Sequence, residues 1–445
     1  MAAKLEMEST ELLQHLIRNA CVNDGTPDSG GERRNADLLA DVLTGAGLEV
    51  QRFTPQGDRT SIVARIEGWD PNAPKVCLMG HTDVVPFNAS GWRQDPLGGE
   101  LIDGEVWGRG AVDMLNLTAS MAVAVRHLAR TGFRPRGDLI YFGVADEEAM
   151  GTWGAKWMCE HHWEAIACDY VLTEMGGWSV HGPNGHKVGI SVGEKGIAWR
   201  RLRIKGTPGH GSMPFGADNA LIKAAEVIRR LSVYRPRARI DNIWRAQVEA
   251  ANLPADIKAA LVDPERIWAA CERLPPATAK HAHACTHTTF SPNVGHGGVK
   301  TNIIPDLVEL DIDIRTVPGT TAEDVNDHLR EALGEALFAE VEVQAMIDHA
   351  ATVSSLETPM WEALTRQMQA VYPAAEFLPQ LLIGGTDARF FRDKGVVGYG
   401  TGLFEQGVTL EEFASRFHGH NERIDTTSLG LCANLWTGVA KDLLG

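Results

Sequence analysis

The sequence predicts an α/β protein in which a domain with a mostly parallel central sheet is interrupted by an inserted α+β sandwich. In the first 195 of the 445 residues, short apolar runs alternate with helical stretches, as in sheets whose parallel strands are joined by helices. After that point, apolar and polar residues alternate within the runs, which is typical of strands with one exposed face. A chain of this length also favours two or three domains.

The first part of the chain begins with two helical stretches, at residues 8–19 and 34–46, whose apolar positions recur at helical spacing. A longer helix is expected at 115–130. Three short apolar runs are expected to form buried strands: 61–66, 75–79 and 138–144. Because active sites of parallel sheets lie beyond the carboxyl ends of the strands, polar residues just after these runs are candidate functional residues.

A second domain is expected over residues 196–348, inserted into a first domain that comprises 1–195 and 349–445. Its elements follow a β-α-β-β-α-β-like order. The expected strands are 198–204, 307–314 and 341–347, and the expected helices are 217–231 and 322–339. Residues 235–275 are interpreted as an extra helical excursion. The chain then returns to the first pattern, with elements at 361–371, 395–400 and from Thr426 onward.

The charge and cysteine content disfavour several kinds of binding partner and several cellular locations. A formal net charge of −16 disfavours binding to nucleic acid or to an anionic membrane, since like charges repel. The start of the chain has no basic segment followed by an apolar run, and no stretch approaches the roughly 20 apolar residues that span a bilayer. The seven cysteines are scattered and form no CxxC pair. We therefore expect a cytoplasmic protein with reduced thiols and no membrane or nucleic-acid partner.

Five separated segments place metal-ligand side chains after an apolar run or in a polar turn. Adjacent carboxylates repel one another unless a cation or solvent compensates, and a metal ion would let one Glu ligate while its neighbour acts as a base. Carboxylates and imidazoles without thiolates suit Zn²⁺ or a similar ion in an open catalytic site. Taken alone, each segment also fits an ordinary polar turn or a helix N-cap. The segments are GHTDVVP with His81 and Asp83, GRGAVDM with Asp113, ADEE with Glu147 and Glu148, LTE with Glu174, and HGHNER with His418.

One further segment carries ligand-type residues in alternation: His281, His283, Cys285 and His287. We expect a strand here, with these four side chains on one face. Same-face neighbours on a strand are roughly 7 Å apart, too far for most pairs to share one ion. A metal site is therefore not expected in this segment.

The chain resembles the dinuclear zinc amidohydrolases and peptidases that include aminoacylase, succinyl-diaminopimelate desuccinylase, acetylornithine deacetylase, carnosinase and bacterial glutamate carboxypeptidase. The resemblance extends from about residue 10 to the end of the chain. Eight segments carry it, all in the family's order: GHTDVVP, DPLGGELIDGEVWGRGAVDM, ADEEAMG, VLTEMGG, GTPGHGSMP, TNIIPD, GGTDARFF and HGHNER. It implies a zinc-peptidase-like catalytic domain with an inserted lid and dimerisation domain.

The resemblance also implies roles for individual residues. Two Zn²⁺ ions per subunit are implied, with Co²⁺ or Mn²⁺ as substitutes. The implied metal ligands are His81 and Glu174 for one ion, Glu148 and His418 for the other, and Asp113 as the bridge between them. Glu147 is the implied general base, and Asp83 the residue that orients the His81 ring. The peptide bond between Asp113 and Met114 is expected to be cis, as in the family.

Other implied roles concern the substrate and a partner subunit. His210, in the inserted domain, is implied to reach the active site of the neighbour in a homodimer and to polarise the scissile carbonyl. The dimer is expected to form through the inserted domain. A guanidinium suits a carboxylate because it binds in a bidentate manner. The residues implied to bind the carboxylate end of the substrate are Asn302, Arg315, Thr386 and Arg389.

We therefore expect a zinc-dependent amidohydrolase that cuts an amide bond beside a free carboxylate, most simply in an N-acyl amino acid. Two close cations lower the pKa of a water molecule, and Glu147 takes its proton and passes it to the leaving amine. A dipeptidase or carboxypeptidase of the same family, acting on a short peptide, attacks the same kind of bond and remains the alternative. A non-catalytic binding protein is disfavoured because every implied ligand is present. An aminopeptidase is disfavoured because Arg315 and Arg389 favour a carboxylate.

Overall fold

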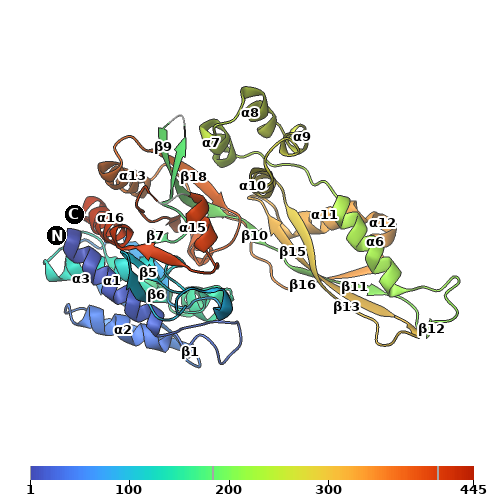
Figure 1. Ribbon diagram of the computed structural model, residues 1–445, viewed down its shortest axis with the longest axis horizontal. Helices are drawn as coiled ribbons and strands as arrows, with labels where there is room; N and C mark the ends of the chain where they lie inside the picture. Colours follow the sequence, from blue (N-terminus) through green and yellow to red (C-terminus); the bar gives the residue numbers. More distant parts are fainter. Residues whose placement is uncertain (1, 183–184, 408–409) are drawn as a thin grey trace. The chain divides into compact units, whose positions relative to one another are not determined.

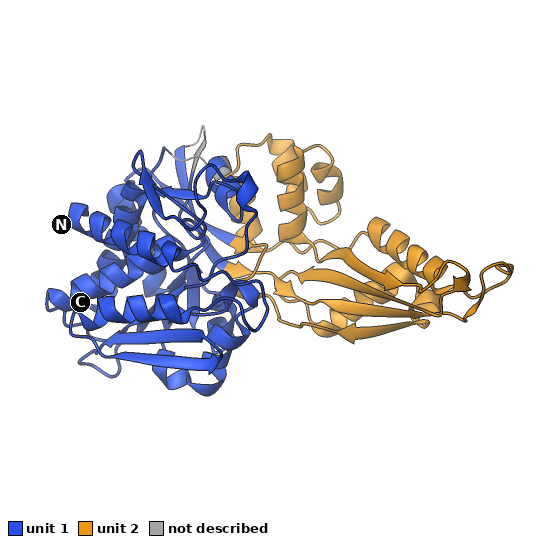
Figure 2. Cartoon of the chain, turned by 60° about the horizontal axis from the view of Figure 1, so that its bottom comes forward, with its two compact units in different colours: residues 1–192, 354–380, 386–445 blue, residues 193–353, 381–385 orange. Residues whose placement is uncertain are grey.

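The computed structural model describes residues 2–182, 185–407 and 410–445, and the chain divides into two compact units (Figures 1 and 2). Unit 1 comprises residues 1–192, 354–380 and 386–445, and unit 2 comprises 193–353 and 381–385. Unit 2 thus contains the whole segment 196–348 that the sequence marks as inserted. The short segment 381–385 belongs to it as well, because the main-chain N–H of Lys195 donates to the carbonyl of Leu382.

The central sheet of unit 1 is parallel in its middle and antiparallel at its edges. Strands β6, β3, β7 and β19 lie side by side in that order and run parallel. On one side β2 and then β1 continue the sheet antiparallel, and on the other side β9 does so. The expected parallel sheet is therefore confirmed for its four central strands. The strands are β1 (Val50–Gln56), β2 (Arg59–Ile66), β3 (Val76–His81), β6 (Leu139–Val144), β7 (Tyr170–Thr173), β8 (Ser179–Gly182), β9 (Gly185–Glu194), β18 (Glu376–Leu382) and β19 (Val397–Gly400).

Helices cover both faces of this sheet. Helix α3 packs against β3 and β6 and is itself covered by α1, α2 and α16. On the opposite face, apolar residues of α4, α5 and α14 share a core with the central strands. All residues of β3 and β6 are buried, which is why both strands appear in the sequence as unbroken apolar runs. The helices are α1 (Ala2–Arg18), α2 (Arg33–Thr44), α3 (Leu115–Arg130), α4 (Trp157–His161), α5 (Trp163–Ile166), α13 (Pro359–Val371), α14 (Ala388–Arg392), α15 (Leu410–Arg416) and α16 (Thr426–Leu444).

The end of β3 is held tightly against α3. A Cβ atom on Gly80 would lie 2.4 Å from Thr118 Oγ1, so only glycine allows this approach. The Thr118 hydroxyl donates to the carbonyl of His81 at 2.7 Å. This contact fixes the strand end from which the His81 side chain projects.

Unit 1 also contains a separate, small three-stranded ribbon of β4 (Glu100–Ile102), β5 (Glu105–Trp107) and β20 (Arg423–Asp425).

Unit 2 contains a five-stranded antiparallel sheet with two helices on one face. Strands β11, β13, β15 and β16 and helices α6 and α11 follow the expected β-α-β-β-α-β order. Burial alternates along the whole of β15, because α6 and α11 cover one face of the sheet and the other carries ion pairs such as Arg201–Asp311. The strands are β10 (Gly196–Ile197), β11 (Arg200–Lys205), β13 (Thr289–Gly297), β15 (Leu307–Thr316) and β16 (Val341–Ala345), with the short pairs β12 (Gly209–His210) and β14 (Ile303–Ile304), and β17 (Thr352–Val353).

The helical excursion of unit 2 is longer than expected. Its four helices share a core of their own around Trp244 and Ile267. The strand expected at 281–287 is wrong, because residues 276–286 form a helix. Alanines separate the polar residues there, and alanine favours helix, while a proline at the first helical position starts it. The unit's helices are α6 (Ala220–Val233), α7 (Asn242–Ala250), α8 (Ala255–Leu261), α9 (Ile267–Cys271), α10 (Pro276–Thr286), α11 (Ala322–Leu333) and α12 (Glu335–Phe338).

Among the residues that the structure describes, no helix combines the length and the apolar character that crossing a bilayer requires.

Candidate metal centre and active site

Ligand-type side chains converge at the carboxyl edge of the central sheet of unit 1. His81 is the last residue of β3, and Glu174 directly follows the neighbouring parallel strand β7. Glu147 and Glu148 lie in the turn after β6, which is the neighbour of β3 on its other side. Because these strands are parallel, their carboxyl ends meet at one edge.

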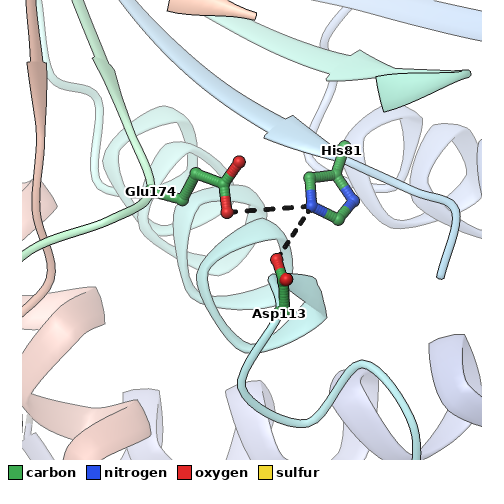
Figure 3. Close-up of side chains that lie close together, drawn as sticks. All are labelled: His81, Asp113 and Glu174. Atoms are coloured by element: carbon green, nitrogen blue, oxygen red, sulfur yellow. Dashed lines mark hydrogen bonds and ion pairs between the residues drawn. The ribbon is translucent and has the colours of Figure 1, made fainter. Parts of the chain in front are cut away.

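Asp113 lies between two histidines from distant parts of the chain. One of its carboxylate oxygens, Oδ1, is 3.2 Å from His81 Nε2, and the other, Oδ2, is 2.9 Å from His418 Nε2. Figure 3 shows Asp113 and Glu174 directed at the same nitrogen of His81, with Glu174 Oε2 at 3.9 Å. On the other side, Glu148 Oε2 is 3.5 Å from His418 Nε2. The result is two ligand groups that share one carboxylate.

Both groups have the size and chemistry of a divalent-metal site. In each, one ligand atom per residue can be chosen so that all three lie within 4.8 Å of one another. Imidazole nitrogens and carboxylate oxygens are the donors that zinc and similar ions take in catalytic centres. Glu148 Oε1 is buried and finds no hydrogen-bond partner among the described residues. The donor set therefore fits divalent metal ions, and Asp113 is common to both groups.

The electrostatics of the site reflect its crowded carboxylates. Burial, followed by repulsion from Asp113, raises the pKa of Glu174 well above its usual range. Burial and Asp113 also raise the pKa of Glu148. Hydrogen bonds to Asp113 and Glu148 raise the pKa of His418 to about 10. Protonation relieves the repulsion between these carboxylates, and bound divalent cations would relieve the same repulsion.

Asp83 holds the His81 ring from behind. His81 Nδ1 is 3.0 Å from the main-chain oxygen of Asp83 and 3.6 Å from its Oδ1, so that Nε2 is directed towards Asp113. The second carboxylate oxygen of Asp83 accepts the main-chain N–H of Glu148 at 3.1 Å and the amide of Asn23 at 2.8 Å. Asp83 thus ties the turn after β3 to the turn after β6, a geometry that suits its implied orienting role.

Glu147 follows Asp146, whose φ of 69° turns the chain sharply after β6. Burial raises the pKa of Glu147 well above its usual range, with attraction to His81 opposing this and repulsion from Asp387 and Glu148 adding to it. Among the described residues, neither ligand group includes Glu147 as a ligand.

Two of the residues expected to bind substrate, Thr386 and Arg389, also belong to unit 1. Arg389 is 4% exposed, and its guanidinium donates to the carbonyl of Thr386 and to that of Met150, each at 2.9 Å. It therefore fastens the loop that follows Glu148. These contacts use two of its donor nitrogens, and a role in binding a carboxylate stays a prediction.

The other three expected residues belong to unit 2. His210, in β12, pairs with Ile303 of β14, and the N–H of Gly211 donates to the carbonyl of Asn302 at 2.9 Å. The structure therefore brings His210 and Asn302 together. The His210 side chain is exposed, with Nδ1 2.8 Å from Ser212 Oγ. Arg315 lies on β15, where its Nε donates to Asp313 at 2.8 Å.

Three functional-site residues were not predicted from the sequence. Glu422 is fully buried and accepts the main-chain N–H groups of Val112 and Asp113 at 2.7 and 3.0 Å. Arg109 pairs with it at 2.7 Å. Both lie in segments that carry the family resemblance, and this resemblance is the sequence signal that could have identified them. Asp387, in the GGTDARFF segment, is 2% exposed, and neither carboxylate oxygen has a hydrogen-bond partner among the described residues.

The expected cis peptide bond between Asp113 and Met114 is confirmed.

Comparison with known proteins matches residues 77–442 to Peptidase family M20/M25/M40. The chain is 26% identical to the N-fatty-acyl-amino acid synthase/hydrolase of Xenopus tropicalis, over 98% of this chain and 86% of that protein. It is 24% identical to aminoacylase-1 of Mus musculus, over 98% of this chain and 96% of that protein. An M20 family metallo-carboxypeptidase from Sulfolobus solfataricus has the same fold, with a TM-score of 0.74 at 18% identity over 98% and 99% of the two chains.

The family match covers most of the chain and includes all five candidate ligands. The fold, the two ligand groups and the relatives agree with one another. The chain therefore belongs to Peptidase family M20/M25/M40 and is a metal-dependent amidohydrolase.

Proposed function

We propose that this protein is a two-zinc enzyme that hydrolyses the amide bond of N-acyl amino acids. The observation that carries the proposal is the placement of Asp113, whose two carboxylate oxygens face different histidines, each with a second carboxylate nearby. The ligand set contains two imidazoles and three carboxylates and no thiolate, which supports zinc, with Co²⁺ or Mn²⁺ as substitutes.

The relatives support an acyl-amino-acid substrate. The full-length relatives named above are a hydrolase of N-fatty-acyl amino acids and an aminoacylase. The alternative is a dipeptidase or carboxypeptidase that acts on short peptides. It is supported by the solved metallo-carboxypeptidase, whose likeness to this chain extends to the fold. Both activities cut an amide beside a free carboxylate, so the two proposals share the same catalytic residues.

In the proposed mechanism, His81, Asp113 and Glu174 would hold one ion, and Asp113, Glu148 and His418 would hold the other. Bound ions supply Lewis-acid chemistry and make water more acidic. Glu147 accepts the proton of the attacking water and delivers it to the nitrogen of the leaving amine, and it is free for this because neither ligand group uses it. Asp83 keeps the His81 ring oriented while charge develops.

Residues of unit 2 are proposed to complete the site from a second copy of the chain. In this arrangement His210 donates a hydrogen bond to the oxyanion that forms from the scissile carbonyl. The exposed edge strand β13 and exposed apolar residues on it and on α6, among them Leu221, Ile228 and Val294, support a homodimer through unit 2. Asn302, Arg315, Thr386 and Arg389 are proposed to bind the carboxylate of the substrate.

The cellular setting is proposed to be the cytoplasm. All seven cysteines are unpaired, which suits a reducing compartment. The formal net charge of −16 supports a small-molecule substrate over nucleic acid or an anionic membrane.

The decisive experiment measures hydrolysis by zinc-loaded enzyme of three matched substrate sets. N-acyl amino acids of graded acyl length, dipeptides with the same C-terminal residue, and N-acyl amino acid amides are assayed side by side. We expect the highest kcat/KM for N-acyl amino acids and a large loss for the amides, which lack the free carboxylate. Preference for dipeptides would favour the alternative, and equal rates on the amides would overturn the carboxylate requirement.

A further inference from the structure

A buried ion pair joins the turns that carry Asp113 and His418. The Glu422 carboxylate accepts the N–H groups of Val112 and Asp113 through Oε1, and Nη1 of Arg109 donates to its Oε2 at 2.7 Å. Nη2 of the same guanidinium donates to the main-chain carbonyl of His418 at 3.3 Å. The Glu422 carboxylate therefore contacts the backbone of Asp113, and the Arg109 guanidinium contacts the backbone of His418.

The pair is fully enclosed. The side chains of Arg109 and Glu422 are 2% and 0% exposed. A buried ion pair is often no more stabilising than apolar residues of the same volume, because both charges lose their hydration. Overall stability therefore gives little reason for a charged pair here. Its specific consequence is geometric, since charge-assisted hydrogen bonds hold the two turns in one arrangement.

The three-stranded ribbon of β4, β5 and β20 has other contacts that hold it together. Strand β20 pairs with β5, and the N–H of Gly108 donates to the carbonyl of Glu422 at 3.0 Å. On the same ribbon, the partly exposed Glu105 pairs with Arg423 at 2.9 Å. None of these contacts reaches the side chain or the N–H of a candidate ligand. The buried pair is thus separable from the contacts that close the ribbon.

We propose that Glu422 and Arg109 are positioning residues that set the affinity of the second metal ion. This inference rests on the proposed two-metal function. The ligand group formed by Asp113, Glu148 and His418 takes two of its three members from the turns that the pair joins. The other group takes only Asp113 from them, because His81 and Glu174 are held by β3 and β7. Loss of the pair therefore weakens the second ion more than the first.

The test is a titration of metal-free full-length protein with Co²⁺, followed by visible absorption and by calorimetry. The variants are Glu422→Gln, which removes the charge and keeps the volume, and Arg109→Lys, which keeps the charge and loses the fork. Glu105→Gln is the matched control on the same ribbon. In both test variants we expect the first ion to bind nearly as in wild type and the second about 10–100-fold more weakly, the range usual for groups that orient metal ligands. The control is expected to bind both ions normally.

The outcomes separate this inference from the function on which it rests. If wild type binds fewer than two ions, the proposed function is wrong and the inference falls with it. Two ions in wild type with unchanged second-ion affinity in the variants would overturn the inference alone. So would an equal weakening of both ions, because a purely structural role predicts it. If Glu422→Gln does not fold, as judged by circular dichroism, Arg109→Lys decides the question.

Discussion

The contact between Asp113 Oδ2 and His418 Nε2, 2.9 Å long, brings together a turn before α3 and a turn near the end of the chain. His418 forms the exposed side of the second ligand group. Its side chain is 53% exposed, whereas Asp113 is buried. The second ligand group therefore consists of an exposed histidine backed by two largely buried carboxylates.

Replacement of Glu147 by Gln is expected to leave both metal ions bound and to lower kcat by about 10²–10⁴-fold, the usual contribution of general acid–base catalysis. The amide keeps the size of the side chain but cannot take up the proton of water. Metal content by mass spectrometry and steady-state kinetics check this. Glu160→Gln, on the exposed side of α4, is the control and should retain normal activity. Near-normal turnover in Glu147→Gln would contradict its role as the base.

His418→Ala is expected to reduce the metal content from two ions per chain to one. His418 belongs to one ligand group, whereas His81, Asp113 and Glu174 form the other without it. Metal analysis after dialysis against a dilute zinc buffer measures the stoichiometry. The control, His420→Ala, removes a neighbouring exposed histidine outside both groups. A variant that still holds two ions at wild-type affinity would show that His418 is not a ligand.

Mixing two inactive variants tests the shared active site. In a mixed dimer of His210→Ala and Glu147→Gln, one site combines an intact Glu147 with the partner's intact His210, so activity should return to about a quarter of wild type if the subunits mix at random. Activity of the mixture relative to each parent is the measurement, with subunit exchange verified by native mass spectrometry. Verified exchange without recovery would count against the model in which a second copy completes the site.

Lys195 predicts a pH dependence of stability in unit 2. Burial lowers its pKa to about 7, with Cys285 and Asp313 opposing and Arg315 adding to the shift. Its ammonium donates to the carbonyls of Ala284 and His287, both at 2.7 Å.

Because the folded-state pKa of Lys195 lies below the ordinary value of 10.5, the unfolded chain binds more protons between these two pH values. The contribution of Lys195 to the free energy of unfolding therefore rises as pH increases from about 7 towards 10, by a few kcal/mol at most. Urea unfolding of wild type and Lys195→Met over this range measures it. A difference between the two proteins that is flat with pH would contradict the shift.

Much of the fold follows from local patterns. The apolar runs that became β3 and β6 are unbroken because both faces of each strand are covered. The alternation that became β15 reflects one covered and one charged face. Where alternation lacked bulky apolar residues, at His281 to His287, the prediction of a strand was wrong, because the intervening alanines favour the helix that α10 forms.

The sequence by itself determined which ligand-type side chains exist and that several follow buried strands, since strand ends and turn residues are local properties. Only the tertiary structure decided that Asp113 presents one oxygen to His81 and the other to His418. It alone also decided that Glu422 and Arg109 tie those turns together. The physical reason is that these contacts join segments far apart in the chain, and their geometry depends on strand pairing and burial that no local pattern contains.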